Sequence, residues 1–476
     1  MSWQWMVLLT INLILIFTII FVDHKKSGEA VLWVLVLILL PVVGILFYLS
    51  FGSTIGIRLT YKIKSHRLSQ EYRSFWLDEL ESVKNKKIPL PCGSDTGMQD
   101  LILFNLNYCE SLLCEKNEVD ILTDGREKYR LLFEDIENAR ESIHIVYYGI
   151  HRDTIGLALV ELLRKKANQG VKVRLMYDGV GSFGTPKKMF APLRRAGGMV
   201  KKIKPYLTHF RNHRKIVVID GKIAYTGGMN IGEKYAGMDR VKTPWRDTQI
   251  RVLGDAVYLL QYYFLYDWFF VHPLSKVGLY DDELAALFPS HTVASELPCQ
   301  VIASGVDTDK EFIRMSYLKL IASAKKKILL QTPYFIPDST ILDALKIAAA
   351  SGVSIEIMLP GVKSSFFLQP VTNHYIAELL EYGVKVYHYH GYLHAKTLSI
   401  DDCVTVIGSV NMDIRSLSVD DEICTVFYSS AFAKRHEEQF ALDRQNSDLL
   451  DNAAFLKRGM LQKAVERFFL LFAPLM

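Results

Sequence analysis

The chain has 476 residues, too many for one ordinary domain and enough for two or three. Half of the residues are hydrophobic and the formal net charge is +5, a composition that favours a membrane part but does not choose between lipid and nucleic acid as the partner. The six cysteines are scattered without a Cys-x-x-Cys pair, which argues against a disulfide framework and indicates reduced thiols.

Two uncharged stretches open the chain, at residues 3–22 and 30–51, with only the segment DHKKSGE between them. Each stretch is about as long as a helix must be to cross the hydrocarbon core of a bilayer. A cleaved signal peptide fits poorly, because no basic segment precedes the first stretch and no small-x-small site precedes the second. We therefore predict two transmembrane helices within residues 1–55.

The distribution of basic residues sets the expected orientation of these helices. The loop between them has two lysines, Lys25 and Lys26. Five basic residues follow the second stretch: Arg58, Lys62, Lys64, Arg67 and Arg73. The positive-inside rule then places the large C-terminal body in the cytoplasm, after a juxtamembrane or linking region at residues 56–120.

The rest of the chain has the pattern of a duplication. The strand-like run QGVKVRLMYD (169–178) resembles SGVSIEIMLP (351–360), and each follows a helix-like run. Val171 and Val353 lie 182 positions apart, and His213 and His394 lie 181 apart, so the offset between the copies is nearly constant. We predict an α/β fold of two similar halves with mixed sheets flanked by helices, at 121–275 and 299–476, joined by a connection at 276–298.

Three further segments have a distinctive composition. The run RRAGGMVKKIK (194–204) is basic. It is either a solvent-exposed surface or a binding surface for anionic lipid headgroups. Residues 257–271 are apolar and aromatic with one Asp, which indicates a buried or interfacial helix. Residues 461–476 mix cationic and apolar residues, as expected of a helix that lies on a membrane or packs on the core.

Each half contains a hairpin-like stretch with polar residues at matching positions, NHRKIVVIDGKIAYTGGMN (212–230) and LHAKTLSIDDCVTVIGSVN (393–411). Asp-Gly and Asp-Asp are read as two-residue turns, which fixes the predicted pairing. In the first hairpin His213 then faces Gly228, and Lys215 faces Thr226. In the second hairpin the corresponding pairs are His394 with Ser409 and Lys396 with Ile407.

This register places a His, a Lys and an Asn of each hairpin on one face, because residues two apart on a strand share a face. The six residues are His213, Lys215, Asn230, His394, Lys396 and Asn411. Imidazole can act as nucleophile or acid–base, ammonium attracts an anion, and the amide donates hydrogen bonds, so the set suits a phosphate. Gly228 and Ser409 would leave room for the ligand. Asp220 and Asp401 lie seven residues from their histidines, roughly 23 Å along an extended strand, and belong to the turns.

The spacing His-x-Lys-x4-Asp, followed by Gly-[Gly/Ser]-x-Asn, occurs twice and resembles the paired HKD motifs of the phospholipase D superfamily. The two-helix N-terminus and the segments TPWRDTQIRVLG (243–254), QTPYFIPD (331–338) and NMDIRSLSVDDE (411–422) resemble bacterial cardiolipin synthases in particular. The resemblance covers essentially the whole chain. It implies two α/β halves with the active site at their interface and one motif, at 213–230 and 394–411, from each half.

The resemblance also implies roles for the motif residues. The expected catalytic residues are His213, Lys215, Asp220, His394, Lys396 and Asp401. One histidine attacks phosphorus to give a phosphohistidine while the other protonates the leaving alcohol, and the usual order makes His213 the nucleophile. The lysines would hold the phosphoryl oxygens together with Asn230 and Asn411. Both substrates would be phosphatidylglycerol, and the products cardiolipin and glycerol.

A nucleophilic imidazole needs its second nitrogen held, usually by a carboxylate. Asp247 and Glu422 occupy similar places after the two motifs, each before a strand-like run. We predict that these two residues orient the histidines. The alternative is that both are surface acids at the start of a strand.

The expected partners are phosphatidylglycerol and other anionic phospholipids of a membrane, without nucleic acid, metal or other cofactor. The stretch GVGSFG (179–184) has the glycine spacing of a dinucleotide site but lacks the acid that should follow it. His388 and His390 have spacings that could ligate zinc, but the lysine beside each motif histidine would repel a cation.

Other functions stay open at this point. A phospholipase D hydrolase, or a phosphatidyltransferase with another alcohol acceptor, would use the same motifs. The two apolar N-terminal stretches argue against a nuclease, and two intact motifs argue against a non-catalytic scaffold. The sequence does not indicate an oligomeric state.

Overall fold

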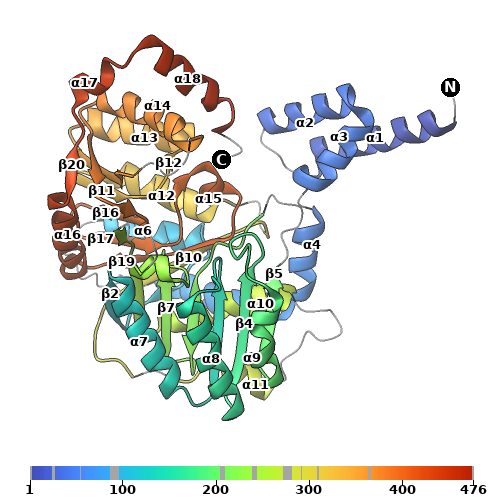
Figure 1. The fold of residues 1–476 in the computed structure, drawn as a ribbon, viewed down its shortest axis with the longest axis vertical. Coiled ribbons are helices and arrows are strands. Elements are labelled where there is room, and N and C mark those ends of the chain that lie inside the picture. The colour runs from blue at the N-terminus through green and yellow to red at the C-terminus, as the bar shows by residue number, and fades with distance from the viewer. Residues whose placement is uncertain are drawn as a thin grey trace.

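The computed structural model describes residues 3–23, 27–53, 55–85, 96–203, 210–238, 244–271, 281–290, 292–307, 310–362 and 366–473. The loop lysines 25 and 26 and parts of the predicted 276–298 connection lie outside these residues. Two sheets, each covered by helices, form the body, and the N-terminal helices extend from its side (Figure 1).

The N-terminal arm contains one long apolar helix, α1 (Trp3–Phe21), followed by α2 (Ser27–Leu39), α3 (Pro41–Phe47) and a π-helical turn (Tyr48–Gly52). Among the described helices only α1 is long and apolar enough to cross a membrane. The predicted second span is not one helix, because Pro41 has no N–H to continue α2 and begins α3 instead. In α3, a Cβ on Gly44 would lie 2.7 Å from the Val36 carbonyl, so α3 folds back closely against α2.

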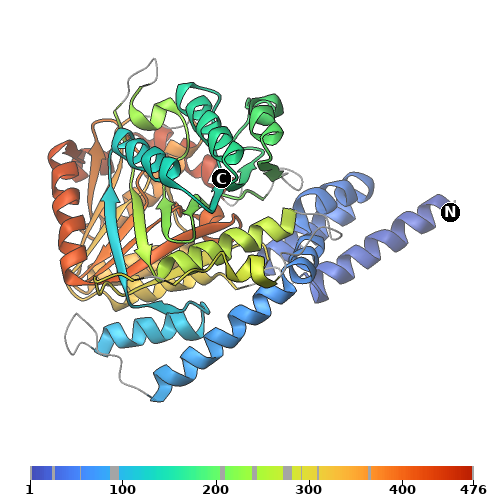
Figure 2. The same ribbon diagram turned by 90° about the horizontal axis from the view of Figure 1, so that it is seen from below.

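Helices α4 (Ile55–Lys64), α5 (His66–Asn85) and α6 (Thr96–Asn107) follow, and α4 and α5 run along the side of the body (Figure 2). The ring of Tyr61 in α4 stacks on Phe270 with 3.8 Å between centroids. Trp76 in α5 donates to the Leu106 carbonyl of α6 (2.7 Å), and Tyr72 donates to the Glu110 carbonyl (2.6 Å). This part of the predicted linking region is therefore helical and packed.

The first sheet has seven strands in the order β2-β9-β7-β6-β3-β4-β5. Their bounds are β2 (Asn117–Leu122), β3 (Ser142–Tyr147), β4 (Lys172–Asp178), β5 (Met199–Ile203), β6 (Ile216–Ile219), β7 (Ile223–Gly227) and β9 (Gln249–Gly254). Strands β3, β4 and β5 are parallel to one another, and every other neighbouring pair is antiparallel.

The second sheet repeats this order as β10-β19-β17-β16-β11-β13-β14, with β1 and β20 added at its edges. The bounds are β1 (Leu113–Cys114), β10 (Cys299–Ser304), β11 (Lys327–Gln331), β13 (Ser354–Pro360), β14 (Lys385–Tyr389), β16 (Thr397–Ile400), β17 (Val404–Gly408), β19 (Glu422–Tyr428) and β20 (Ser447–Leu449). Here too only β11, β13 and β14 are parallel to one another. The predicted duplication is confirmed at the level of strand order and direction.

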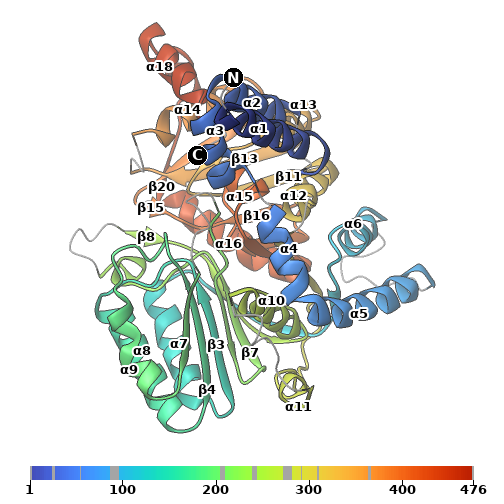
Figure 3. The same ribbon diagram turned by 90° about the vertical axis from the view of Figure 1, so that its right-hand side faces the viewer.

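Helices cover the sheets, and Figure 3 shows α7, α8 and α9 on the outer side of the first one. The helices of the first half are α7 (Gly125–Asn138), α8 (Thr154–Asn168), α9 (Ala191–Arg195) and α10 (Ala256–Val271), with 3₁₀ turns at Lys187–Phe190 and Glu233–Ala236. Asp124 and Asp153 cap α7 and α8 by accepting from backbone N–H groups of their first turns.

The later helices are α11 (Asp281–Ala285), α12 (Phe312–Ser323), α13 (Ser339–Ala350), α14 (Leu368–Leu380), α15 (Ile414–Ser418), α16 (Ser430–Gln445), α17 (Asn452–Leu456) and α18 (Met460–Leu470). Apolar residues of α10 join residues of both sheets in one core between the halves. The predicted apolar helix is thus buried. Its Asp267 is accommodated by Arg214, with 2.6 Å between carboxylate and guanidinium. The C-terminal α18 lies against α14 and exposes Met460 and Leu461.

Candidate active site

The two motif hairpins have a register that differs by one residue from the predicted one. The expected turns form, with positive φ at Asp220 and Gly221 and at Asp401 and Asp402. Each turn is followed by an extra residue, Lys222 in the first hairpin, whose N–H donates to the Ile219 carbonyl (2.9 Å).

The extra residue shifts every pair. Ile216 faces Thr226 in the first hairpin, and Thr397 faces Ile407 in the second. The predicted pairs of Lys215 with Thr226 and Lys396 with Ile407 are therefore wrong. By the same register Gly228 does not face His213, and Ser409 does not face His394.

Gly228 and Ser409 instead accommodate the two predicted acids. A Cβ on Gly228 would lie 2.0 Å from Asp247 Oδ1, so a larger residue would displace that carboxylate. The Ser409 hydroxyl donates to Glu422 Oε2. The prediction that these small residues leave room for a ligand opposite the histidines is wrong, because the carboxylates occupy that space.

His213 is held by a carboxylate of the other half. Its Nδ1 lies 2.8 Å from Glu422 Oε1 in β19, and the Glu422 side chain is fully buried. The backbones are joined as well: the His213 N–H donates to the Asp421 carbonyl (2.8 Å), and the Asp421 N–H donates to the Arg211 carbonyl (2.9 Å). Glu422 is thereby fixed beside the first motif.

His394 has the reciprocal arrangement. Its Nδ1 lies 2.6 Å from Asp247 Oδ2, which belongs to the first half. The short strands β8 (Trp245–Arg246) and β15 (Tyr392–Leu393) pair in parallel, and the His394 N–H donates to the Arg246 carbonyl (2.6 Å). Each acid therefore orients the histidine of the opposite copy.

The surroundings of both imidazoles favour the neutral form. Burial, with the neighbouring ammonium of Lys215, lowers the pKa of His213 well below its usual value. Burial and Lys396 lower the pKa of His394 to about 3. Since a carboxylate accepts from Nδ1, the proton of each neutral ring is on Nδ1 and Nε2 keeps its lone pair. A neutral Nε2 can act as a nucleophile or a base.

The two motif lysines are buried beside the histidines. Lys215 Nζ donates to the His213 carbonyl (2.6 Å), and Lys396 Nζ donates to the His394 carbonyl. Burial lowers the pKa of Lys215 to about 8 and that of Lys396 to about 7. Burial likewise raises the pKa of Glu422 to about 7, and attraction between this carboxylate and the ammonium groups opposes both changes.

Both histidines and both asparagines line one cavity of about 310 Å³ between the halves. Asn230 is held by its neighbours: its Oδ1 accepts from the Gly149 N–H (3.0 Å), and its Nδ2 donates to the Tyr235 hydroxyl (3.1 Å). The structure therefore brings His213, Asn230, His394 and Asn411 together, as the spacing of the motifs predicted.

Sequence reasoning missed much of the cavity wall. The further lining residues include Tyr148, Arg211, Lys234, Tyr235, Trp245, Tyr334, Tyr392, Arg415 and Asp420. Tyr148 contacts the edge of His213 with 4.8 Å between ring centroids, and Trp245 lies 5.2 Å from His394. These rings pack beside the two imidazoles. Trp245 lies inside the segment 243–254, which resembles cardiolipin synthases, so the sequence could have indicated it. Nothing in the sequence singles out Tyr148.

The glycine-rich stretch at 179–184 is a turn that supports the first motif. Asp178 accepts from the N–H groups of Val180 (2.7 Å) and Gly181 (2.9 Å), and its other oxygen accepts from Asn212 N–H (3.1 Å). The Asn212 side chain in turn donates to Asp267 (2.7 Å). This turn thus positions the residue that precedes His213.

Asp220 and Asp401 lie at the turns, away from the cavity. Asp220 accepts from three consecutive N–H groups, those of Arg140, Glu141 and Ser142 (2.7–2.9 Å), and Asp401 does the same for residues 325–327. Each aspartate ties its hairpin to the start of the neighbouring strand. Neither lines the cavity, and this position argues for a structural role in place of the predicted catalytic one.

Replacing Asp220 by alanine is therefore expected to affect stability more than turnover. Three N–H groups lose their acceptor and alanine must adopt a φ near 52°, so we expect a loss of about 1–3 kcal/mol in the free energy of unfolding. Thermal unfolding and turnover at 25 °C check this, with Asp220→Asn as the matched control, which tolerates that φ. A large loss of turnover at an unchanged melting temperature would instead place Asp220 in the chemistry.

The pH dependence of kcat/KM is expected to peak near neutrality. The Glu422 carboxylate is present only above its pKa of about 7, and the ammonium forms of Lys396 and Lys215 are lost above about 7 and 8. Activity on an anionic substrate should therefore fall on both sides of this range. Because bound phosphate favours the ammonium forms, the alkaline fall of kcat should lie at higher pH than that of kcat/KM. Coinciding alkaline falls in the two profiles would contradict this assignment.

Two sheets of matching strand order, with a histidine and an asparagine of each half lining one cavity and a buried lysine beside each histidine, define a protein of the phospholipase D type. The comparisons with known proteins agree. The family model described as "Cardiolipin synthase, PLD-like domain" matches residues 132–240 and 317–444, and "Phospholipase_D-nuclease N-terminal" matches residues 10–53.

Relatives that match over almost the whole chain identify the family within the phospholipase D type. The chain is 34% identical over 478 residues to a cardiolipin synthase of Listeria monocytogenes serotype 4a (strain HCC23), covering 99% of this chain and 98% of the relative. It is 38% identical over 475 residues to a cardiolipin synthase of Staphylococcus aureus (strain Mu50 / ATCC 700699), covering 98% and 95%. The chain belongs to the cardiolipin synthase family, whose members are phosphatidyltransferases of the phospholipase D type.

The fold also has a solved counterpart. The crystal structure of phosphatidylserine synthase from Haemophilus influenzae Rd KW20 matches with a TM-score of 0.61 and 15% identity, covering 79% of this chain and 98% of that one. At this identity the match concerns the fold alone.

Proposed function

We propose that the protein makes cardiolipin from two molecules of phosphatidylglycerol and releases glycerol. The observation that carries this proposal is the pair of buried histidines, each held at Nδ1 by a carboxylate of the opposite half and lining one cavity. The full-length likeness to cardiolipin synthases supports the same reaction.

In the first step His213 Nε2 attacks the phosphorus of one phosphatidylglycerol. An N–P bond forms and the P–O bond to the glycerol headgroup breaks, which leaves a phosphatidyl-histidine. His394 gives a proton to the departing glycerol oxygen. To do so it must be protonated at Nε2 when substrate is bound. The phosphate anion and Asp247 favour that cation, against the burial that lowers the pKa of His394.

In the second step the headgroup hydroxyl of another phosphatidylglycerol attacks the same phosphorus. His394 takes the hydroxyl proton, a P–O bond forms, the N–P bond breaks, and cardiolipin leaves with His213 restored. One phosphodiester replaces another, so no external energy source is needed. Water at the same position would give phosphatidic acid.

Lys215 and Lys396 would neutralise the phosphoryl oxygens as negative charge builds up on them. Asn230 and Asn411 would donate hydrogen bonds to the same oxygens. Their positions on the cavity wall, and the burial of both lysines, support these roles.

With α1 as an anchor, the site would lie next to its lipid substrates, and the length and apolar composition of α1 support this role. We propose that α1 crosses the membrane and that α2 and α3 enter it together and return to the same side, because Val22 and Ile55 line one hollow, with the catalytic body facing the cytoplasm. The basic residues that follow residue 53 support this orientation.

The products formed from labelled phosphatidylglycerol test the proposal. The purified full-length protein in anionic vesicles should yield cardiolipin and glycerol in equal amounts. Phosphatidic acid as the sole lipid product would reject the synthase reaction in favour of hydrolysis. Products that appear only when another alcohol is added would indicate a different acceptor.

A further inference from the structure

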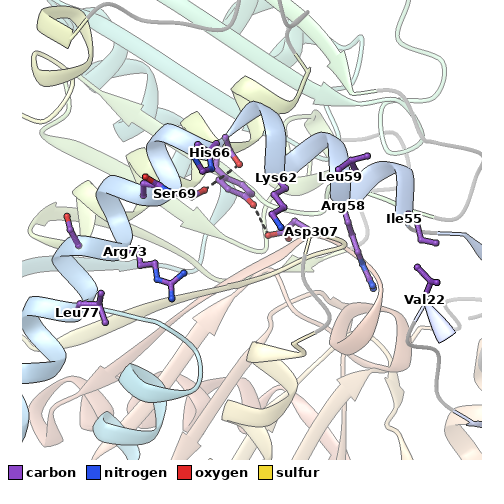
Figure 4. A pocket seen from close by; sticks show the side chains of 14 residues that line it. Val22, Ile55, Arg58, Leu59, Lys62, His66, Ser69, Arg73, Leu77 and Asp307 are labelled. Atoms are coloured by element: carbon purple, nitrogen blue, oxygen red, sulfur yellow. Dashed lines mark hydrogen bonds between the residues drawn. The ribbon is translucent and has the colours of Figure 1, made fainter.

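A second and larger hollow lies outside the motif region. It has a volume of about 880 Å³ and is bounded by α4 and α5, by the residue after α1 and by the body, and it shares no lining residue with the catalytic cavity (Figure 4). We refer to it as the α4–α5 cleft. Its walls are largely helical positions outside the ranges matched by the family models.

The lining of the α4–α5 cleft combines apolar and basic side chains. Val22, Ile55 and Leu59 form an apolar end beside the C-terminal end of α1, and Arg58 lies among them (Figure 4). Lys62 lies one turn further along α4, and Arg73 lines the far part on α5, after the bend at Ser65.

Contacts with the body fix parts of this lining. Arg58 Nε donates to the Val306 carbonyl (3.2 Å), which holds the guanidinium at the wall. Asp307 is the acidic residue in the lining, and its carboxylate accepts from the Tyr266 hydroxyl (3.0 Å). Three cationic side chains against one carboxylate leave the α4–α5 cleft with a net positive charge.

The position of the α4–α5 cleft relative to α1 indicates the source of its ligand. The apolar helix α1 ends at Phe21, and Val22 lines the cleft. With α1 in the bilayer, this end of the cleft lies at the level of the lipid headgroups. Apolar side chains beside α1 with Arg58 and Lys62 next to them match the place where the acyl chains of a phospholipid meet its phosphate.

We propose that the α4–α5 cleft binds an anionic phospholipid of the surrounding membrane, at a site separate from the catalytic cavity. Arg58 and Lys62, one turn apart on α4, contact its phosphate, Arg73 on α5 adds positive charge further along the groove, and the acyl chains pass Ile55 and Leu59 toward α1. A lipid held in this way fastens the α4–α5 segment, and with it the body, to the membrane surface.

Photolabelling tests this site independently of turnover. The full-length protein with His213→Ala, which cannot consume the probe, is placed in phosphatidylcholine nanodiscs. A trace of phosphatidylglycerol with a diazirine near its ester groups is added. Peptides from residues 55–77 should be labelled. In the triple variant Arg58→Gln/Lys62→Gln/Arg73→Gln the labelling yield of these peptides should fall at least about tenfold. The reason is that each cation near a membrane surface contributes about fivefold to binding.

The matched control removes the same charge elsewhere: Arg140→Gln/Lys165→Gln/Lys222→Gln replaces exposed cations of the first half and should keep full labelling. Leu59→Gln, which changes only the apolar end, should also weaken labelling, so the proposal does not depend on one variant. Excess cardiolipin should compete and water-soluble glycerol 3-phosphate should not. Equal labelling by a phosphatidylcholine probe, unchanged labelling in the triple variant, or displacement by glycerol 3-phosphate would overturn the proposal.

Discussion

Replacing either motif histidine by alanine is expected to lower phosphatidyl transfer by at least about 10⁴-fold, because one change removes the nucleophile and the other the proton donor. The two variants should differ in what they can still do. With a phosphatidyl ester of nitrophenol, whose leaving group needs no proton, His394→Ala should still form a phosphoenzyme. His213→Ala should form none with any substrate.

Acid-quenched mass spectrometry of the phosphoenzyme measures this difference. His390→Ala is the matched control, because His390 is an exposed histidine near the same strands that pairs with Asp448 (3.0 Å). It should leave turnover unchanged. A phosphoenzyme trapped in His213→Ala but not in His394→Ala would exchange the two proposed roles.

The carboxylates that hold the histidines should have the next largest effects. Glu422→Gln and Asp247→Asn keep the shape of each side chain but remove the charge that stabilises the imidazolium, and we expect kcat to fall by about 10²- to 10⁴-fold. Because each acid serves the histidine of the opposite half, Glu422→Gln should slow phosphoenzyme formation from every substrate. Asp247→Asn should slow it mainly when the leaving group needs a proton.

Stopped-flow measurement of the rate of phosphoenzyme formation, with the phosphatidyl nitrophenyl ester and with phosphatidylglycerol, separates the two effects. Glu127→Gln, an exposed acid of α7, is the control for a change of charge alone and should have no effect. Unchanged turnover in Glu422→Gln would remove that residue from the mechanism. Equal slowing of both substrates by Asp247→Asn would contradict its assignment to the proton donor.

The sequence predicted the duplication, the mixed sheets and the cluster of His213, His394, Asn230 and Asn411, because these depend on spacing that both copies share. The hairpin register could not be read in the same way. The Asp-Gly signal specifies the turn, but Lys222 is an extra residue after it, and one extra residue moves every later side chain by one place. Pro41 could have predicted the break in the second apolar stretch, but a prediction from hydropathy alone does not take a proline into account.

The partners of the two acids were beyond prediction for a different reason. Asp247 and Glu422 follow their own motifs at similar distances, so spacing alone suggests that each serves its own copy. Their true partners depend on how the halves pack, through β8 with β15 and through Asn212 with Asp421. Such pairing between distant segments leaves no local pattern. The same holds for Tyr148 and Tyr392, which reach the cavity from opposite halves.

The exchange of carboxylates between the halves also bears on the origin of the protein. In each half the histidine and the acid are bonded to partners in the other, so a single copy of this unit would have an imidazole without its carboxylate. Two such units related by a twofold axis would complete both pairs at once. The duplicated chain is therefore equivalent to a symmetric dimer that has been fused into one polypeptide. Fusion then allows the residues around the two histidines to differ, which identical subunits cannot do.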